Sequence, residues 1–166
     1  MVRISPLPVA LLAAGVLLAG AIAGLHTTAS AQDPGARTLT FTELERGATF
    51  KHVRNTKGAS ERSNLAGDQI VFTNPLADAS GARAGRIWVG CVTTGGARDF
   101  MKSTLTCTGV ITLADGTLAL QGNTSPNART TTVAVTGGTG AYANARGVYV
   151  SEPASGGSST TITLAG

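Results

Sequence analysis

Glu43 is the side chain best placed for acid–base chemistry. It lies in residues 38–44, where Leu39, Phe41 and Glu43 alternate with threonines. Strict alternation is the pattern of a β-strand, and it places these three side chains on one face. A carboxylate on an otherwise apolar face could exchange protons with a bound molecule. The alternative is a carboxylate at the rim of the strand, solvated by water.

Cys91 and Cys107 are the other reactive side chains, either as thiols or as a disulfide. If the segments that carry them pair as antiparallel strands with Cys91 opposite Cys107, further pairs follow. They are Ile87 with Ile111, Val89 with Gly109 and Thr93 with Leu105. This register gathers apolar residues on one face, and a slip by one residue would expose them. The pattern predicts a Cys91–Cys107 disulfide on the buried face, with a free Cys91 thiol as the alternative.

A glycine-rich segment, residues 137–140, follows a strand-like run. Gly138, Gly140 and Ala143 match the G-x-G-x-x-A spacing of dinucleotide-binding loops, which also need a following helix and a later acidic residue. No helical period follows here, and no Asp or Glu comes after Glu152. The segment is therefore predicted to be a tight structural corner rather than a nucleotide site.

Three polar side chains have structural interpretations, and one of them, Arg146, also has a ligand-binding interpretation. Arg146, behind the glycine corner, is predicted to form either a salt bridge or a contact with an anionic ligand. Tyr142 is predicted to plug the space beneath the corner, and Asn74 to cap a strand end. His52 is the one histidine after Ala31, so the sequence predicts no metal site.

The segments that must position these residues read as short strands, and no helical stripe is present after Ala31. The expected strands are residues 38–44, 49–54, 68–74, 86–94, 101–113, 117–121, 129–136, 147–152 and 160–164. Pro75 is expected to end the third strand because it has no N–H. Asp115-Gly116 is expected to form a two-residue turn that places Leu113 opposite Leu118 and Ile111 opposite Leu120.

These strands predict an all-β fold, a closed eight-stranded antiparallel β-barrel, because closure removes exposed sheet edges. A barrel of this size holds side chains or one small ligand. Aromatic residues are only 4% of the chain, too few to fill the interior alone, so a ligand cavity is expected. The net charge is a mild +4 with scattered arginines, which argues against nucleic-acid binding.

The N-terminus has the parts of a secretory signal peptide: Arg3, an apolar run over residues 9–25 and the small residues 29–31. Cleavage after Ala31 would release a secreted protein with no membrane attachment. An uncleaved anchor is the alternative, because the run is near the shortest length that spans a bilayer. The expected organisation is a signal peptide (1–31), a flexible leader (32–37) and one barrel domain (38–166).

Four segments resemble the allene oxide cyclase barrel, and the resemblance runs in order along the chain. They are residues 67–76, 90–92, 116–122 and 134–140, and Ala145-Arg146-Gly147 also resembles the dirigent proteins of the same superfamily. The resemblance implies an eight-stranded barrel with an apolar cavity, often in dimers or trimers, and no metal or organic cofactor. It implies isomerase or cyclase chemistry, or the guiding of a coupling reaction, on a small apolar molecule.

By this resemblance Phe72, Asn74 and Cys91 match cavity residues of the plant cyclases. The cyclase Glu falls at Thr40 and its Pro at Thr49, and the dirigent acid falls at Ala141, so the plant activity itself is not expected. Glu43 is then the candidate catalytic acid. The candidate cavity residues are Phe41, Phe72, Asn74, Cys91, Leu120 and Arg146.

Three functions remain open. The first is a cavity catalyst that confines and orients a reactive molecule. The second is a non-catalytic extracellular carrier, and the third is a structural or interaction barrel with a solid interior. Fold alone does not choose among them.

Overall fold

The alternating segments form strands throughout the part of the chain that the computed structural model describes, residues 35–57 and 59–166. The proposed signal peptide and residues 32–34 lie outside the described residues. The strands are β1 (Arg37–Leu44), β2 (Thr49–Val53), β3 (Gln69–Ala77), β4 (Arg83–Gly95), β5 (Thr104–Leu113), β6 (Gly116–Thr124), β7 (Thr131–Gly140), β8 (Gly147–Ala154) and β9 (Gly157–Leu164). One short 3-10 helix, η1 (Phe100–Lys102), is the helical element of this part.

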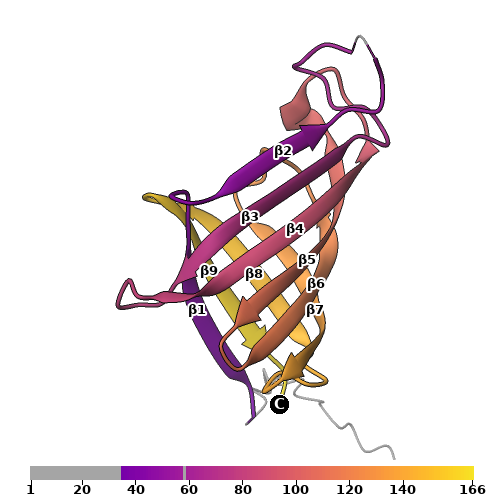
Figure 1. Ribbon diagram of the computed structural model, residues 1–166. Coiled ribbons are helices and arrows are strands. Elements are labelled where there is room, and N and C mark those ends of the chain that lie inside the picture. The colour runs from indigo at the N-terminus through magenta and orange to yellow at the C-terminus, as the bar shows by residue number, and fades with distance from the viewer. Residues whose placement is uncertain (1–34, 58) are drawn as a thin grey trace, which may run out of the picture. The chain divides into compact units, whose positions relative to one another are not determined.

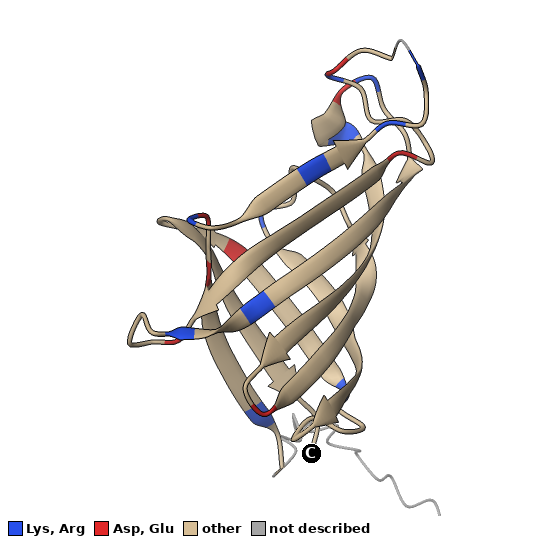
Figure 2. Ribbon diagram, in the orientation of Figure 1, with Lys and Arg blue, Asp and Glu red and all other residues tan. Residues whose placement is uncertain are grey.

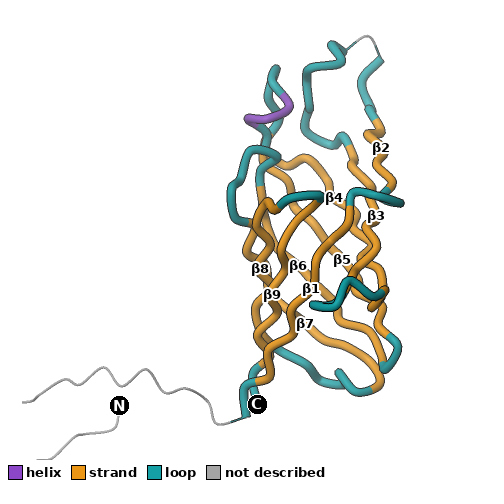
Figure 3. The backbone as a smooth tube through the Cα atoms, turned by 90° about the vertical axis from the view of Figure 1, so that its left-hand side faces the viewer, coloured by secondary structure: helices purple, strands orange, loops and turns teal. Residues whose placement is uncertain are grey.

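The strands pair with their neighbours in the order β1-β9-β8-β7-β6-β5-β4-β3-β2. β1 also pairs with β3, with Thr42 opposite Ala77 and Glu43 opposite Leu76, which closes the sheet into a barrel (Figure 1). β2 lies outside this closure as an extra strand on β3. The fold is therefore the predicted closed eight-stranded antiparallel barrel with one strand added, and Figure 3 shows it from the side.

The predicted register of β4 and β5 is confirmed. Cys91 lies opposite Cys107, and the other three predicted pairs are also present. The two cysteines form a disulfide with their Cα atoms 4.0 Å apart. Such a short separation is typical of a non-hydrogen-bonded pair in an antiparallel sheet, where the side chains approach most closely.

The β5–β6 turn differs from the prediction. Leu113 pairs with Gly116, so the two turn residues are Ala114 and Asp115, and the register is shifted by two residues. Gly116 pairs with Gly140, where an added Cβ would collide with the Thr139 carbonyl, so Gly116 serves close strand contact rather than the turn. A shift of two keeps every side chain on its predicted face.

Two strand ends also differ from the prediction. β3 continues through Pro75 to Ala77, because Pro75 falls between the last residue paired with β2, Thr73, and the first paired with β1, Leu76. On the side of β1 and β2, its missing N–H therefore leaves no ladder bond unmade. The predicted strand 101–113 begins instead at Thr104, because Asp99 caps η1 by accepting a hydrogen bond from the Met101 N–H.

The barrel end at the glycine corner is packed with apolar side chains. The buried members of this cluster include Leu76, Ile111, Leu118, Ile162 and Leu164. Tyr142 is 4% exposed and packs with them, while its hydroxyl donates to Asp115 at 3.1 Å. The predicted Tyr142 plug is thus present at this end.

Charged side chains are sparse along the barrel strands and gather mainly near the loops (Figure 2). Among the described residues, no helix is long and apolar enough to cross a membrane.

Candidate functional site

A pocket of ≈ 380 Å³ lies inside the other end of the barrel. Phe100 of η1, Phe50 of β2 and the β6–β7 loop contribute to its rim. Inward side chains of β3 to β6 form one side, and those of β1, β8 and β9 form another.

Glu43 lines this pocket and is 5% exposed. Its Oε1 accepts hydrogen bonds from the Tyr149 hydroxyl and, at 2.8 Å, from the Thr160 hydroxyl. Its Oε2 accepts a hydrogen bond of 2.9 Å from the Asn74 amide. The carboxylate is therefore held by donors from three other strands, and the solvated-rim alternative does not describe it.

Tyr149 is one of the two hydroxyl donors to Oε1 of Glu43. Burial is the main cause that raises the pKa of the Tyr149 hydroxyl, and the charge and hydrogen bond of Glu43 raise it further. Tyr149 therefore stays protonated at neutral pH and serves as a hydrogen-bond donor to Glu43.

The pocket has two chemically different sides. The polar wall includes Glu43, Asn74, Tyr149, Ser151 and Ser158, and Thr108, Gln121, Thr124, Ser125 and Thr131 line the pocket elsewhere. The apolar wall consists of Ile70, Phe72, Val89, Cys91, Leu105 and Cys107. β8 and β9 lie across the barrel from β4 and β5 in the strand order, so Tyr149, Ser151 and Ser158 face Val89, Cys91, Leu105 and Cys107.

Five of the residues predicted for the site line the pocket: Glu43, Phe72, Asn74, Cys91 and Leu120. Asn74 is not a strand-end cap, since β3 continues beyond it and its amide binds Glu43. Cys91 is oxidised in the disulfide, so it offers no thiol to a ligand.

Phe41 and Arg146 lie elsewhere, which corrects their assignment to the cavity. Phe41 faces inward as predicted but packs against the apolar cluster, because it is two residues nearer the filled end than Glu43. Arg146 is exposed at the glycine corner and donates to the Ala145 carbonyl at 2.8 Å. The salt bridge predicted for Arg146 is not among the ion pairs of the described residues.

Sequence reasoning missed Tyr149 and Thr160. They lie 106 and 117 positions from Glu43, on β8 and β9, whose places beside β1 in the barrel were not deduced. The available signal was alternation: Tyr149 and Ser151 share a face of β8, and that face includes the only tyrosine within a predicted strand.

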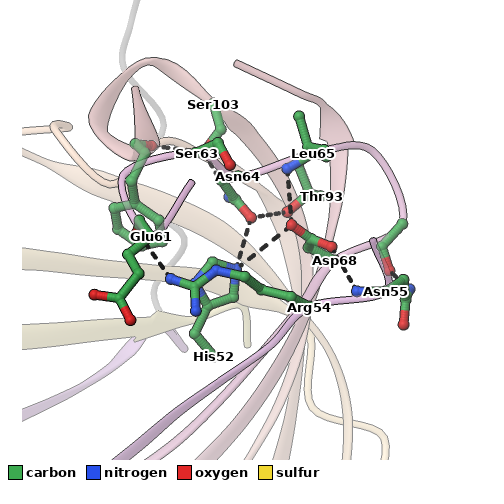
Figure 4. A network of polar contacts seen from close by, with 12 residues as sticks. His52, Arg54, Asn55, Glu61, Ser63, Asn64, Leu65, Asp68, Thr93 and Ser103 are labelled. Carbon is green, nitrogen blue, oxygen red and sulfur yellow. Dashed lines mark hydrogen bonds and ion pairs between the residues drawn. The ribbon is translucent and has the colours of Figure 1, made fainter. Parts of the chain in front are cut away.

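A second polar cluster ties the loop after β2 to the barrel (Figure 4). Asn64 is fully buried; its Oδ1 accepts from the Thr93 hydroxyl at 2.8 Å and lies 3.1 Å from His52 Nε2. Its amide donates to the Ser103 hydroxyl at 2.7 Å. The cluster thus joins the loop to β2, to β4 and to the residue before β5.

Asp68 completes this cluster. Its fully buried carboxylate accepts backbone hydrogen bonds from Asn55 and Leu65, both at 2.9 Å, and lies 3.7 Å from His52 Nε2. Burial acts to raise the pKa of Asp68, but these two hydrogen bonds, with His52 and Arg54, outweigh burial and hold the pKa below its usual value. The cluster therefore has a fixed anion at its centre.

The second cluster supports the pocket rather than forming part of it. None of His52, Asn64, Asp68, Thr93 and Ser103 is among the residues that line the pocket. The His52 ring packs against Phe100 with 5.6 Å between ring centroids, and Phe100 contributes to the rim. Within the described residues no three His, Cys, Asp or Glu side chains lie close enough to hold a metal ion.

The geometry of the pocket suits confinement of a small molecule beside one carboxylate. A side chain held by three donors is fixed in direction, which is what proton exchange with a bound molecule requires. The apolar wall supplies contact area without competing polar groups.

No protein-family model and no curated protein matches the sequence. Among solved structures, a pyocyanin demethylase is similar, with 22% identity, a TM-score of 0.63, and coverage of 77% of this chain and 99% of that chain. A pterocarpan synthase dirigent protein has 15% identity and a TM-score of 0.54, over 78% of this chain and 81% of that chain. A Diels–Alderase from Streptomyces koyangensis has 14% identity and a TM-score of 0.54, over 82% of this chain and 70% of that chain. The chain has the fold of the dirigent and cyclase barrels.

Proposed function

We propose that this protein is a secreted barrel that binds a small, largely apolar molecule in its pocket and guides its isomerisation, cyclisation or coupling. The observation that carries the proposal is the buried Glu43 carboxylate, held by three donors at the polar wall of a ≈ 380 Å³ pocket. Pockets of a few hundred Å³ with a few fixed polar groups are typical ligand sites. The names of the structural neighbours also refer to chemistry on small organic molecules.

In this proposal the pocket acts mainly by confinement. Holding reacting atoms close together and in line lowers the entropic part of the barrier to ring closure or coupling. Glu43 accepts a proton from one atom of the bound molecule and returns it to another atom of the same molecule. The reaction therefore neither takes up nor releases a proton overall. Tyr149, Thr160 and Asn74 act as positioning residues, because their hydrogen bonds fix the carboxylate.

Export is part of the proposal. The charged, apolar and small-residue pattern of the N-terminus motivates cleavage near Ala31. The Cys91–Cys107 disulfide is consistent with an oxidising compartment outside the cytoplasm.

The first experiment tests whether the pocket holds a ligand. Native mass spectrometry of the purified protein should detect a bound small molecule, or a fluorescent apolar dye should bind it with saturation. Val89→Trp fills the pocket from the apolar wall and should abolish this binding. Val148→Trp is the matched control, because Val148 is 44% exposed on β8. Equal binding by the two variants, both shown to fold by circular dichroism, would rule out the pocket.

A carrier is separated from a catalyst by Glu43→Gln. The test follows once a bound molecule is identified. If the protein is a catalyst, Glu43→Gln should still bind this molecule, but the rate of turnover should fall by about 10²-fold or more. A carrier should return the molecule unchanged in both forms. Turnover by wild type that Glu43→Gln leaves intact would remove Glu43 from the mechanism.

An interaction barrel is a second candidate, favoured by an apolar area on the outer face. Trp88 is 52% exposed, and Val71 and Val110 lie beside it around a shallow depression of ≈ 300 Å³. A dimer or trimer formed through this face is the assembly that we propose for it. Sedimentation velocity of wild type and Trp88→Ser tests it: a monomeric wild type contradicts the assembly, and dissociation by the variant supports it.

A further inference from the structure

We infer that the molecule bound in the pocket presents an N–H or O–H donor, or a positive charge, to Glu43, and that the pocket rejects carboxylic acids of the same shape. This inference rests on the proposed ligand-binding function and assigns the chemical class of the ligand. It follows from the hydrogen bonds and charges around Glu43.

The first step concerns the acceptor sites of the carboxylate. An ionised carboxylate has about four lone-pair sites for hydrogen bonds. Oε1 uses two of them, for Tyr149 and Thr160, and Oε2 uses one, for Asn74. One site on Oε2 remains, and Glu43 is a pocket-lining residue, so a donor on a bound molecule can complete the set.

The second step concerns charge. Neither of the ion pairs formed within the described residues includes Glu43. The residues that line the pocket include no Lys, Arg, His or Asp, so Glu43 supplies the only full charge there. A buried anion without a counter-ion attracts a cation and repels an anion, and the apolar surroundings strengthen both effects.

The third step concerns shape. Val89 and Leu105, on the strands opposite β8 and β9, offer no hydrogen-bond partner from their side chains. A ligand that fills the space between the two walls therefore has an apolar body with its donor or positive charge at one edge. A molecule with a carboxylate at that edge would place two anions side by side in a poorly hydrated space.

Three probes with the same fused-ring body test this inference: 2-naphthylmethylammonium, 2-naphthylmethanol and 2-naphthoate. Each is titrated into the full protein, with displacement of a bound fluorescent apolar dye as the readout. We expect the ammonium to bind at least as tightly as the alcohol. We expect the acid to bind about tenfold more weakly than the alcohol, or worse, because a hydrogen bond to a charged group is replaced by repulsion.

Glu43→Gln supplies the decisive variant because it removes the charge and keeps the shape. It should reduce the preference for the ammonium by about tenfold and restore binding of the acid. Glu45→Gln is the matched control: it removes the same charge two residues away, at an exposed position after β1, and should leave the order of the probes unchanged.

The outcomes separate this inference from the proposed function. If the dye binds but the acid binds as tightly as the ammonium, the charge preference is wrong and the ligand pocket stands. The same conclusion follows if Glu43→Gln leaves the wild-type order intact. If neither dye nor probe binds the wild-type protein, the proposed function fails and takes this inference with it. Should Glu43→Gln not fold, the wild-type order still decides.

Discussion

At the scale of single residues, the centre of this protein is a buried carboxylate held by neutral donors. Glu43 accepts from two hydroxyl groups and one amide, so its burial is offset by hydrogen bonds rather than by an ion pair. A buried charged group costs several kcal/mol unless such bonds are made. The donors therefore stabilise the fold and fix the direction of the carboxylate together.

Tyr149→Phe should destabilise the protein near neutral pH, by about 1.5–3 kcal/mol, because a buried hydrogen bond to a charged group is lost. The difference in stability between wild type and Tyr149→Phe should become smaller above pH 10. The pKa of Tyr149 is raised by folding, so unfolded Tyr149 ionises near its ordinary value of 10.0 while the folded residue keeps its proton. The free energy of unfolding of wild type therefore falls as pH rises through 10.0. The phenylalanine variant has no hydroxyl at this position, so it lacks the loss that comes from Tyr149.

Urea denaturation of both proteins at about pH 8 and about pH 11 measures the effect. Tyr142 contributes to the alkaline loss in both proteins, because burial also raises its pKa. The comparison therefore isolates Tyr149. A deficit of the same size at both pH values would contradict the prediction.

At the scale of elements, two devices hold neighbouring strands in register. The Cys91–Cys107 disulfide joins β4 to β5 beside the pocket. The glycine corner lets the end of β7 approach the β5–β6 turn so closely that the Ala141 N–H donates to the Asp115 carbonyl at 2.9 Å. The disulfide and the glycine corner each act locally, so we expect the barrel to keep its strand order when either one is removed.

Replacing both cysteines with alanine should lower the free energy of unfolding by about 2–4 kcal/mol, because the cross-link restricts the unfolded chain. The barrel should still form, since Ile87 and Ile111 keep the same register. Guanidinium denaturation measures the loss, and wild type treated with a reductant should show a similar one. Two thiols titrated in unfolded, unreduced wild type would show that the bond does not form in the isolated protein.

Gly138→Ala should destabilise the protein by about 1–3 kcal/mol, the usual cost of overpacking. The new Cβ would collide with the backbone carbonyl oxygens of Thr117 and Tyr142, which cannot move without opening the corner. Gly90→Ala is the control, because its Cβ would meet nothing within 4 Å. Thermal unfolding compares the two: equal shifts in Tm would mean that the corner does not need glycine at residue 138.

At the scale of the whole molecule, closure creates one interior with two different ends. The contact between β1 and β3 completes the barrel and also brings Glu43 beside Asn74. Large apolar side chains fill the end at the glycine corner. The other end contains the pocket, and Phe100 contributes to its rim. A closed barrel with one open end is suited to holding a single small molecule.

We expect the mature protein to begin near Gln32 and to be found outside the cytoplasm. The motive is the Arg3 start, the apolar run and the small residues before the proposed cleavage site. N-terminal sequencing of protein from the culture supernatant measures it. Retention of Met1, or protein confined to the cell membrane, would favour the uncleaved anchor instead.

The sequence by itself determined the features that depend on neighbours along the chain or on one pair of strands. Alternation gave the strand positions and faces, because side-chain direction in a strand repeats every two residues. The β4–β5 register followed because a slip by one would have exposed its apolar residues, and the disulfide followed from that register. The glycine corner was predicted because closely spaced glycines without a following helix indicate a tight turn.

Only the tertiary structure decided which inward side chains meet. Phe41 and Glu43 share a face, yet the height of each within the closed barrel places one in the packed cluster and the other in the pocket. Tyr149 and Thr160 reach Glu43 because β8 and β9 follow β1 around the barrel, an order that no local pattern encodes. The turn at Ala114-Asp115 likewise depends on the docking of β7 against Gly116, a contact between segments that are distant in sequence. Local patterns therefore fix the direction of a side chain, whereas barrel closure fixes the side chains that it contacts.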